Sequence, residues 1–219
     1  MATDLQTRGA ATKDKILDAA EQLFTEHGVG ATSLRSIVAE ANVNVASVHY
    51  HFGSKEDLIR AVIQRRLSEL SSLRAAELNT LIERWGKKPI PINELLTAFM
   101  SPALSFGKDQ TRGGPNFARF VARMHSESDP MVQEELFNQI HKIVELYIQE
   151  LQKSMPKCPP QELSMRMAFA AGAMIQAILL PLRPSFVEYF SFNNLDSNEL
   201  LEILVNFCTR GMDENTGVK

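Results

Sequence analysis

Cysteine, tryptophan and tyrosine are scarce in this chain of 219 residues, which contains two Cys, one Trp and three Tyr. The cysteines, Cys158 and Cys208, lie far apart and form no CxxC pair, which argues against a disulfide framework and against a thiol metal site. The small number of Tyr and Trp residues and the lack of an alternating run of β-branched residues argue against strands. We therefore expect an all-α protein whose cysteines stay free in a reducing cytoplasm.

A strong charge of one sign is also missing, because the formal net charge is −3. Residues 1–66 carry equal numbers of basic and acidic side chains. Bulk charge therefore gives no indication of nucleic-acid binding, and any such contact must depend on where single cations lie, such as Arg35 and Lys55.

The sequence lacks a secretion signal and a long uninterrupted apolar run. The polar start, MATDLQTRGAATKDK, does not resemble a leader and is expected to fray. The longest apolar run, Met167 to Leu182, contains Gln176 and Pro181 and is shorter than a typical membrane span. We expect a buried or dimer-forming helix there, and no contact with a membrane.

Catalytic and cofactor signatures are likewise missing. There is no G-x-S-x-G, P-loop or HExxH pattern, and the five His residues are scattered. We expect no catalytic residue, no cofactor and no metal ion. Two alternatives stay open at this point: a helical enzyme that uses His125 and His141, and a helical protein–protein adaptor.

The strongest signal is the stretch TSLRSIVAEANVNVASVHYHFGSKEDL, which runs from Thr32 to Leu58. Thr32 or Ser33 can cap a short helix whose apolar residues follow at helical spacing. Asn42-Val43-Asn44 interrupts that spacing, because Asn favours turns and caps.

A second short helix is expected from Val45 to about His51, with Gly53 as its end and Ser54 as the cap of the next helix. Two short helices joined by a tight turn are the arrangement of a helix-turn-helix, whose second helix enters the DNA major groove.

This second helix would present small and polar side chains to DNA. Ser47 and His49 can hydrogen-bond to base edges, and Tyr50 and His51 suit phosphate contacts. Lys55 would lie at a helix N-terminus, which itself favours a phosphate. The candidate DNA-contacting residues are Thr32, Ser33, Arg35, Asn44, Val45, Ala46, Ser47, His49, Tyr50, His51 and Lys55. The pattern His49-x-His51 could instead belong to a metal site, but no further ligand lies nearby in sequence.

The stretch resembles the DNA-binding domain of the TetR family of bacterial transcriptional regulators. The likeness covers about Lys13 to Val62 and agrees in helix order, turn residues and the Ser-Lys-Glu helix start. The matching residues are Leu23-Phe24, Thr32, Ile37, Ala41-Asn42-Val43-Asn44, Tyr50, Phe52 and Ser54-Lys55-Glu56-Asp57-Leu58.

Two positions depart from the family pattern. Asn42 stands where the family usually has Gly, and Asn also tolerates left-handed backbone angles. His49 stands where the family usually has Tyr, which affects the bases that are read and leaves the fold unchanged.

The resemblance implies a helix-turn-helix DNA-binding domain over residues 1–64 and a larger helical ligand-binding and dimerisation domain over residues 65–219, with about nine helices in total. Helical spacing and breakers place the expected helices at about 13–27, 34–41, 45–51, 54–85, 93–106, 116–126, 129–155, 161–182 and 197–212. Residues 107–115 and 184–196 are expected to be loops.

The resemblance further implies a cytoplasmic repressor that binds a palindromic operator in double-stranded DNA as a homodimer. The last two long helices, Gln161–Leu182 and Ser197–Met212, would pair with those of a second copy. The stretch from Ala168 to Ala173 is rich in small residues and would allow close approach of helices.

The family also implies a small-molecule inducer, held by an apolar pocket in the middle helices. The candidate wall residues are Phe99, Met100, Phe117, Phe120, Met124, Tyr147, Met174 and Ile178. Phe and Met at helical spacing are more often ordinary core, so both interpretations stand. The PPQEL stretch near residue 160 and the Gly211-Met212 end are similar to fatty-acid-responsive members of the family, which suggests an acyl chain.

Overall fold

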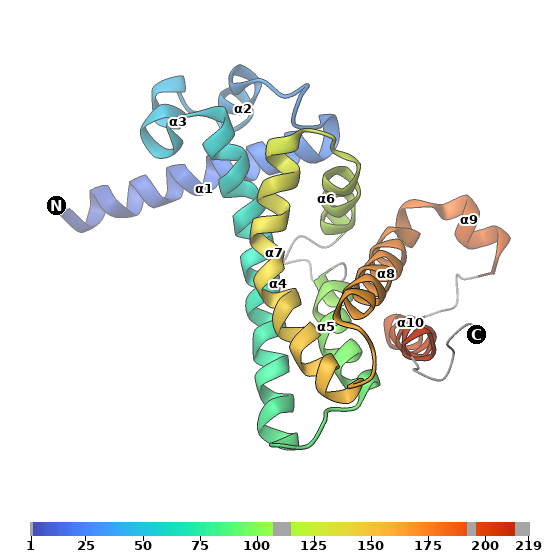
Figure 1. Cartoon of the computed structure of the whole chain (residues 1–219). Coiled ribbons are helices and arrows are strands. Elements are labelled where there is room, and N and C mark those ends of the chain that lie inside the picture. The colour runs from blue at the N-terminus through green and yellow to red at the C-terminus, as the bar shows by residue number, and fades with distance from the viewer. Residues whose placement is uncertain (1, 107–114, 192–195, 213–219) are drawn as a thin grey trace. The chain divides into compact units, whose positions relative to one another are not determined.

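The computed structural model describes residues 2–106, 115–191 and 196–212, except for the side chains of residues 2–8, 115 and 197, and these ranges contain helices and turns without strands (Figure 1). The described residues form ten α-helices and one short 3-10 helix. The helices are α1 (Ala2–His27), α2 (Leu34–Glu40), α3 (Val45–Phe52), α4 (Lys55–Trp85), α5 (Ile92–Phe106), α6 (Pro115–Ser126), α7 (Pro130–Ser154), α8 (Pro160–Leu179), η2 (Leu180–Leu182), α9 (Pro184–Tyr189) and α10 (Ser197–Gly211).

The all-α prediction is confirmed, but two segments differ from the expected helices. Helix α1 begins at Ala2 and not near Lys13, because the polar start contains no proline and includes alanines that favour helix. The segment after residue 183 was expected to be irregular, yet it forms α9, which has Pro184 in its first turn, a position that proline favours. The expected loop at residues 107–115 falls largely outside the described residues.

The chain divides into two compact units, and α4, α6 and α7 contribute residues to both. The first unit comprises Met1–Ser68 and Ala122–Gln139. In this unit α1 packs on α2 and on α3. Its fully buried side chains include Ile16, Ile37, Val48, Leu58 and Val132, so an apolar core holds the short helices α2 and α3 in place.

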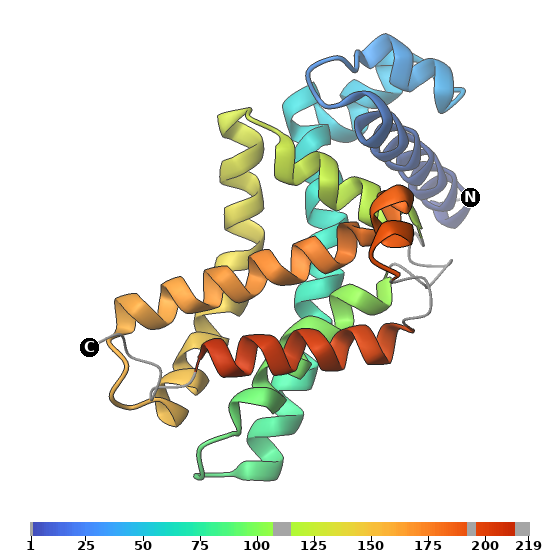
Figure 2. The ribbon, with the colours of Figure 1, turned by 90° about the vertical axis from the view of Figure 1, so that its right-hand side faces the viewer.

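The second unit comprises Glu69–Val121 and Ile140–Lys219. Within it α8 and α10 lie side by side and both pack on α5 (Figure 2). Its core includes Leu95, Phe99, Phe106, Tyr147 and Leu163, each at most 2% exposed. Helix α5 continues through Pro102, although a proline inside a helix lacks the backbone N–H that would close a helical hydrogen bond.

The apolar segment Pro160–Leu182, formed by α8 and η2, is long and apolar enough to cross a membrane by length and composition, with a mean hydropathy of 1.6. The apolar run Met167 to Leu182 was expected to be too short to cross a membrane, but the helical segment also includes residues 160–166 and passes this test of length and composition. In the second unit α8 packs on α5 and α10 through buried residues that include Leu163, Met167 and Met174. This packing is that of a core helix.

Candidate DNA-binding surface

The turn between α2 and α3 is closed by backbone hydrogen bonds and by one asparagine with a left-handed backbone. Ser33 caps α2 by accepting a hydrogen bond from the backbone N–H of Ser36. Asn42 has a φ of 51°, a region that Asn enters more readily than most residues. The N–H of Val43 then donates to the carbonyl of Val38 at 3.0 Å. The turn therefore forms without glycine, as the sequence predicts.

Asn44 caps α3 with its side chain. Its Oδ1 accepts hydrogen bonds from the backbone N–H of Ser47 at 2.8 Å and from the Ser47 hydroxyl at 3.0 Å. The hydroxyl hydrogen of Ser47 is thus used inside the protein, and the oxygen lone pairs are what this side chain can offer to a base.

Helix α3 turns one apolar residue into the core and leaves its polar face outside. Val48 is fully buried, whereas Tyr50 is 84% exposed and Val45 is 41% exposed. Ala46 and His49 are also exposed, and Phe52 is half-buried. An exposed helix face of small and polar side chains can approach base edges in a groove.

The imidazole of His49 is oriented by the end of its own helix. Its Nδ1 lies 2.8 Å from the carbonyl oxygen of Gly53, which has a φ of 80°. A carbonyl can only accept, so Nδ1 carries the hydrogen, and Nε2 of the neutral ring is an acceptor. Adenine N6 and cytosine N4 are the donors that such an acceptor can read in the major groove.

One predicted DNA contact, Thr32, needs correction. Its side chain is buried, with 3% exposure. The hydroxyl lies 2.8 Å from the carbonyl of Gly28 and 3.2 Å from that of Leu23. These carbonyls belong to the end of α1, where helical partners run out. Thr32 therefore ties α1 to the start of α2 and does not face DNA.

Lys55 is half-buried, and its Nζ donates a hydrogen bond of 2.9 Å to the carbonyl of Val29. Its role as a phosphate contact stays a prediction. The N-terminus of α4 is also occupied: the Ser54 hydroxyl donates to Asp57 Oδ2 at 2.6 Å and accepts from the Asp57 N–H at 3.0 Å. The hydrogen bond from Ser54 is the main cause that lowers the pKa of Asp57 below 3.8. A carboxylate at this helix end weakens the attraction of the helix dipole for a phosphate.

The other predicted contacts lie at the surface of the first unit. Ser33, Arg35, Asn44, Val45, Ala46, His49 and Tyr50 are exposed, and Ser47 and His51 are half-buried. The rings of Tyr50 and His51 meet edge to face, with centroids 5.0 Å apart. Arg35 and Tyr50 are exposed and stay candidates for phosphate contacts.

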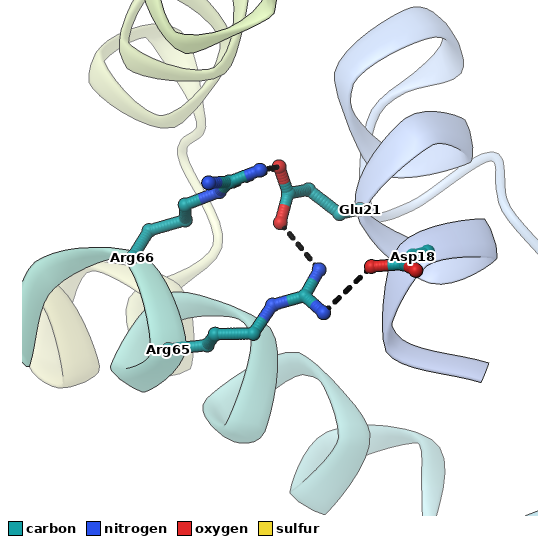
Figure 3. Close-up of polar contacts among 4 residues, drawn as sticks. All are labelled: Asp18, Glu21, Arg65 and Arg66. Carbon is teal, nitrogen blue, oxygen red and sulfur yellow. Dashed lines mark hydrogen bonds and ion pairs between the residues drawn. The ribbon is translucent and has the colours of Figure 1, made fainter. Parts of the chain in front are cut away.

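A buried ion-pair network, which the sequence analysis missed, joins α1 to α4 in the first unit (Figure 3). Glu21 is 8% exposed and accepts hydrogen bonds from Arg65 at 2.7 Å and from Arg66 Nε at 2.7 Å. Arg65 also donates to Asp18 at 2.7 Å. Burial disfavours the charge of Arg65, but its bonds to Glu21 and Asp18 raise its pKa overall. These two arginines hold α1 and α4 together.

The candidate pocket residues lie in buried positions, as both interpretations of them require. Six belong to the core of the second unit: Phe99, Met100, Phe117, Tyr147, Met174 and Ile178. Phe120 is also buried in that unit. Met124 is buried but belongs to the first unit, so it does not extend this group.

Sequence reasoning missed Arg74, which lies inside the second unit with 3% exposure. Its Nε donates to the carbonyl of Phe99 at 2.8 Å, and its Nη2 lies 3.4 Å from the sulfur of Met174. The Tyr147 hydroxyl donates to the Arg74 carbonyl at 2.9 Å. Burial lowers the pKa of Arg74 to about 10. The signal was its spacing of four residues from Leu70 and Leu78, both buried, which places Arg74 on the core face of α4.

The alternative that His49 and His51 belong to a metal site gains no support from the positions of other possible ligands. Within residues 2–106, 115–191 and 196–212, no three His, Cys, Asp or Glu side chains gather as a metal site.

Known families match both parts of the chain. Residues 16–62 match the family described as "Bacterial regulatory proteins, tetR family". Residues 97–211, more than half of the chain, match the "Tetracyclin repressor-like, C-terminal domain". The chain belongs to the TetR family. This assignment confirms the resemblance and makes the protein a TetR-family transcriptional regulator. The TetR family is not enzymatic, so the enzyme alternative with His125 and His141 is set aside.

Curated relatives of this TetR-family chain match over a limited stretch. It is 43% identical over 70 residues to the HTH-type transcriptional repressor Rv3405c of Mycobacterium tuberculosis, covering 32% of this chain and 37% of that protein. It is 35% identical over 63 residues to the HTH-type transcriptional regulator UidR of Escherichia coli, covering 29% and 32%. The chain thus spans about a third of the length of these relatives.

Solved TetR-like structures share the fold across nearly the whole chain. A tetR family transcription regulator from Shewanella has a TM-score of 0.65 at 17% identity, covering 91% of this chain and 97% of that one. A complex of SmeT with triclosan has a TM-score of 0.65 at 16% identity and 95% coverage of both chains. FadR of Bacillus subtilis in complex with stearoyl-CoA has a TM-score of 0.64 at 14% identity, with 90% and 97% coverage.

Proposed function

We propose that this TetR-family regulator is a cytoplasmic repressor that binds a palindromic operator as a homodimer and leaves it when a small apolar molecule binds. In this proposal residues 1–64 bind DNA, and residues 65–219 bind the ligand and the second copy. The observation that carries the proposal is the exposed face of α3, with Val48 buried behind it and His49 and Tyr50 in front.

The roles on this face divide by chemistry. His49 offers Nε2 to a base edge, and the Ser47 oxygen lies two residues earlier on the same helix. Tyr50 and Arg35 reach phosphates, which position the protein without reading sequence. With so few cations, phosphate contacts give only weak binding to DNA of any sequence. Tight binding therefore needs contacts to base edges and a second copy of the chain on the same operator.

A surface for the second copy is supported by large apolar side chains on α8 and α10, which lie side by side (Figure 2). Met165 and Phe169 on α8 are 56% and 70% exposed, and Ile203 and Phe207 on α10 are 54% and 70% exposed. Phe169 and Phe207 line one open groove. Monomeric proteins seldom expose such a contiguous apolar patch, and two such helices from each copy would form a four-helix bundle.

The ligand part of the proposal is supported by the buried Phe, Met and Tyr side chains of the second unit. The relatives also point to apolar ligands, since one solved structure holds triclosan and another holds stearoyl-CoA. Methionine adapts its shape with little cost, so Met100 and Met174 suit a core that must open for a guest. An acyl chain is the ligand class that we propose.

The test begins with the purified full-length chain and random DNA fragments. The bound fragments are sequenced after repeated selection, and the winning site is titrated at several salt concentrations. We expect one enriched site with two-fold symmetry, bound less tightly as salt rises. Fatty acids and their derivatives are then screened for release of that site. A chain that binds all fragments alike, or none, contradicts the proposal.

A further inference from the structure

We propose that the guanidinium of Arg74 holds the carboxylate of an amphiphilic ligand, whose hydrocarbon tail is buried in the core of the second unit. This inference rests on the proposed function, because it names the polar end of the apolar ligand.

The first observation is a buried cation without an acid. Arg74 is 3% exposed, and no carboxylate among the described residues forms an ion pair with it. Other arginines of the chain do have such partners: Arg66 pairs with Glu21, and Arg166 with Glu162. Removing an ion from water costs several kcal/mol unless a counter-charge compensates. With a pKa of about 10, Arg74 still carries its charge at neutral pH.

The second observation is the poor use of its hydrogen-bond donors. A guanidinium has five N–H donors arranged as a fork. Within the described part of the chain, acceptors for Arg74 are the carbonyl of Phe99 and the thioether sulfur of Met174. A thioether is a weak acceptor on a flexible side chain, so a guest can displace it. A carboxylate fits the fork with two parallel hydrogen bonds.

A purely structural role explains only part of this geometry. The Phe99 carbonyl lies in α5 close to Pro102, and the hydrogen bond from Arg74 Nε gives this carbonyl a side-chain donor. That task needs one N–H group and no charge. The Nη2 atom of Arg74 points toward the Met174 sulfur, and Cζ of Arg74 lies 4.0 Å from the centroid of the Phe99 ring.

The surroundings determine the class of ligand. Phe99, Tyr147 and Met174 place two rings and a thioether around the cation, so whatever binds beside the carboxylate must be apolar. A thioester has no free carboxylate that could accept two parallel hydrogen bonds from the guanidinium fork. We therefore infer a simple long-chain carboxylate and not a thioester with a bulky carrier.

The test compares acids with alcohols of the same chain length. The full-length protein is titrated by calorimetry with laurate and palmitate, and with dodecanol and hexadecanol. We expect each acid to bind roughly 10- to 100-fold more tightly than its alcohol, because charged hydrogen bonds favour the acid alone. Palmitoyl-CoA is a further probe, and we expect it to bind less tightly than palmitate.

Three variants locate the preference. Arg74→Met should remove the preference for the acid over the alcohol, while the alcohol still binds. Arg74→Lys should keep part of that preference. Met174→Leu should not weaken the binding of palmitate, because the carboxylate takes the place of the Met174 sulfur beside Arg74. Arg84→Met is the matched control, since Arg84 lies on the same helix, is exposed and pairs with Glu94.

Each outcome is decisive. Equal binding of acid and alcohol by the wild type overturns the inference, as does an Arg74→Met variant that folds and keeps the acid preference. Tighter binding of palmitoyl-CoA, or no binding of any probe, also overturns it. If Arg74→Met does not fold, the comparison of acid with alcohol binding by the wild type and the palmitate binding of Met174→Leu decide. Operator DNA is selected without ligand, so a failure of the proposed DNA-binding function can be told apart from a failure of the Arg74 site.

Discussion

The ammonium group of Lys55 donates a hydrogen bond of 2.9 Å to the backbone carbonyl of Val29, a residue 26 positions earlier in the chain. The bond joins the start of α4 to the segment between α1 and α2. A lysine that the sequence places among the DNA contacts is thus part of the scaffold that holds α2 and α3.

Replacing Lys55 should therefore affect stability as well as DNA binding. We expect Lys55→Met to lower the free energy of unfolding by about 1–3 kcal/mol, because the Val29 carbonyl loses its partner. Binding to operator DNA and binding to random DNA should be weakened alike. Urea unfolding followed by circular dichroism measures the first effect. Unchanged stability with weakened DNA binding would show that Lys55 acts as a phosphate contact and that its bond to Val29 contributes little.

The correction at Thr32 gives a second prediction. Thr32→Val keeps the shape of the side chain but leaves the carbonyls of Gly28 and Leu23 without its hydroxyl, which should cost about 1–3 kcal/mol of stability. Base preference should not change. Ser33→Ala is the neighbouring comparison and removes the α2 cap, at a cost of about 0.5–2 kcal/mol. An altered base preference for Thr32→Val at normal stability would contradict the buried position.

The ion-pair network gives a third prediction. Glu21→Gln leaves Arg65 and Arg66 without their shared carboxylate and should destabilise the protein by about 3–5 kcal/mol. Asp18→Asn removes a carboxylate that is 72% exposed, so its effect should stay within about 1 kcal/mol. Denaturant unfolding of both variants measures the difference. Equal effects would show that burial of Glu21 does not govern the network.

Assembly gives a fourth prediction. Phe169→Glu places a charge on the apolar surface of α8 and should convert the dimer to a monomer, with loss of tight operator binding. Phe137→Glu is the matched control, because Phe137 is 61% exposed on α7, outside that surface. Sedimentation at several protein concentrations measures the mass. A Phe169→Glu variant that remains dimeric would place the interface elsewhere.

Local sequence rules predicted those parts of the fold that depend on neighbouring residues. Ser33 and Asn44 cap the helices as expected, and the left-handed backbone of Asn42 follows from the tolerance of asparagine. Gly28 and Gly53, both with positive φ, follow the helices that they were expected to end.

The errors arose where residues distant in sequence decide the outcome. Thr32 faces inward because its hydroxyl binds the carbonyls of Leu23 and Gly28, and periodicity within one helix contains no information on such a contact. Arg74 was missed for a related reason: an arginine at a core position reads as a surface residue until Phe99 and Met174 are seen around it.

The central claim is that α3 reads bases in a two-fold-symmetric operator, and base preference of matched variants tests it most directly. Random DNA is selected in parallel with the wild type, with His49→Ala and with Tyr50→Phe, and the bound fragments are sequenced. We predict that His49→Ala loses discrimination at one base pair in each half-site, by about 1–3 kcal/mol per position. Tyr50→Phe should bind all sequences less tightly without a change of preference. Identical preferences for the wild type and His49→Ala, or a selected site without symmetry, would contradict the account.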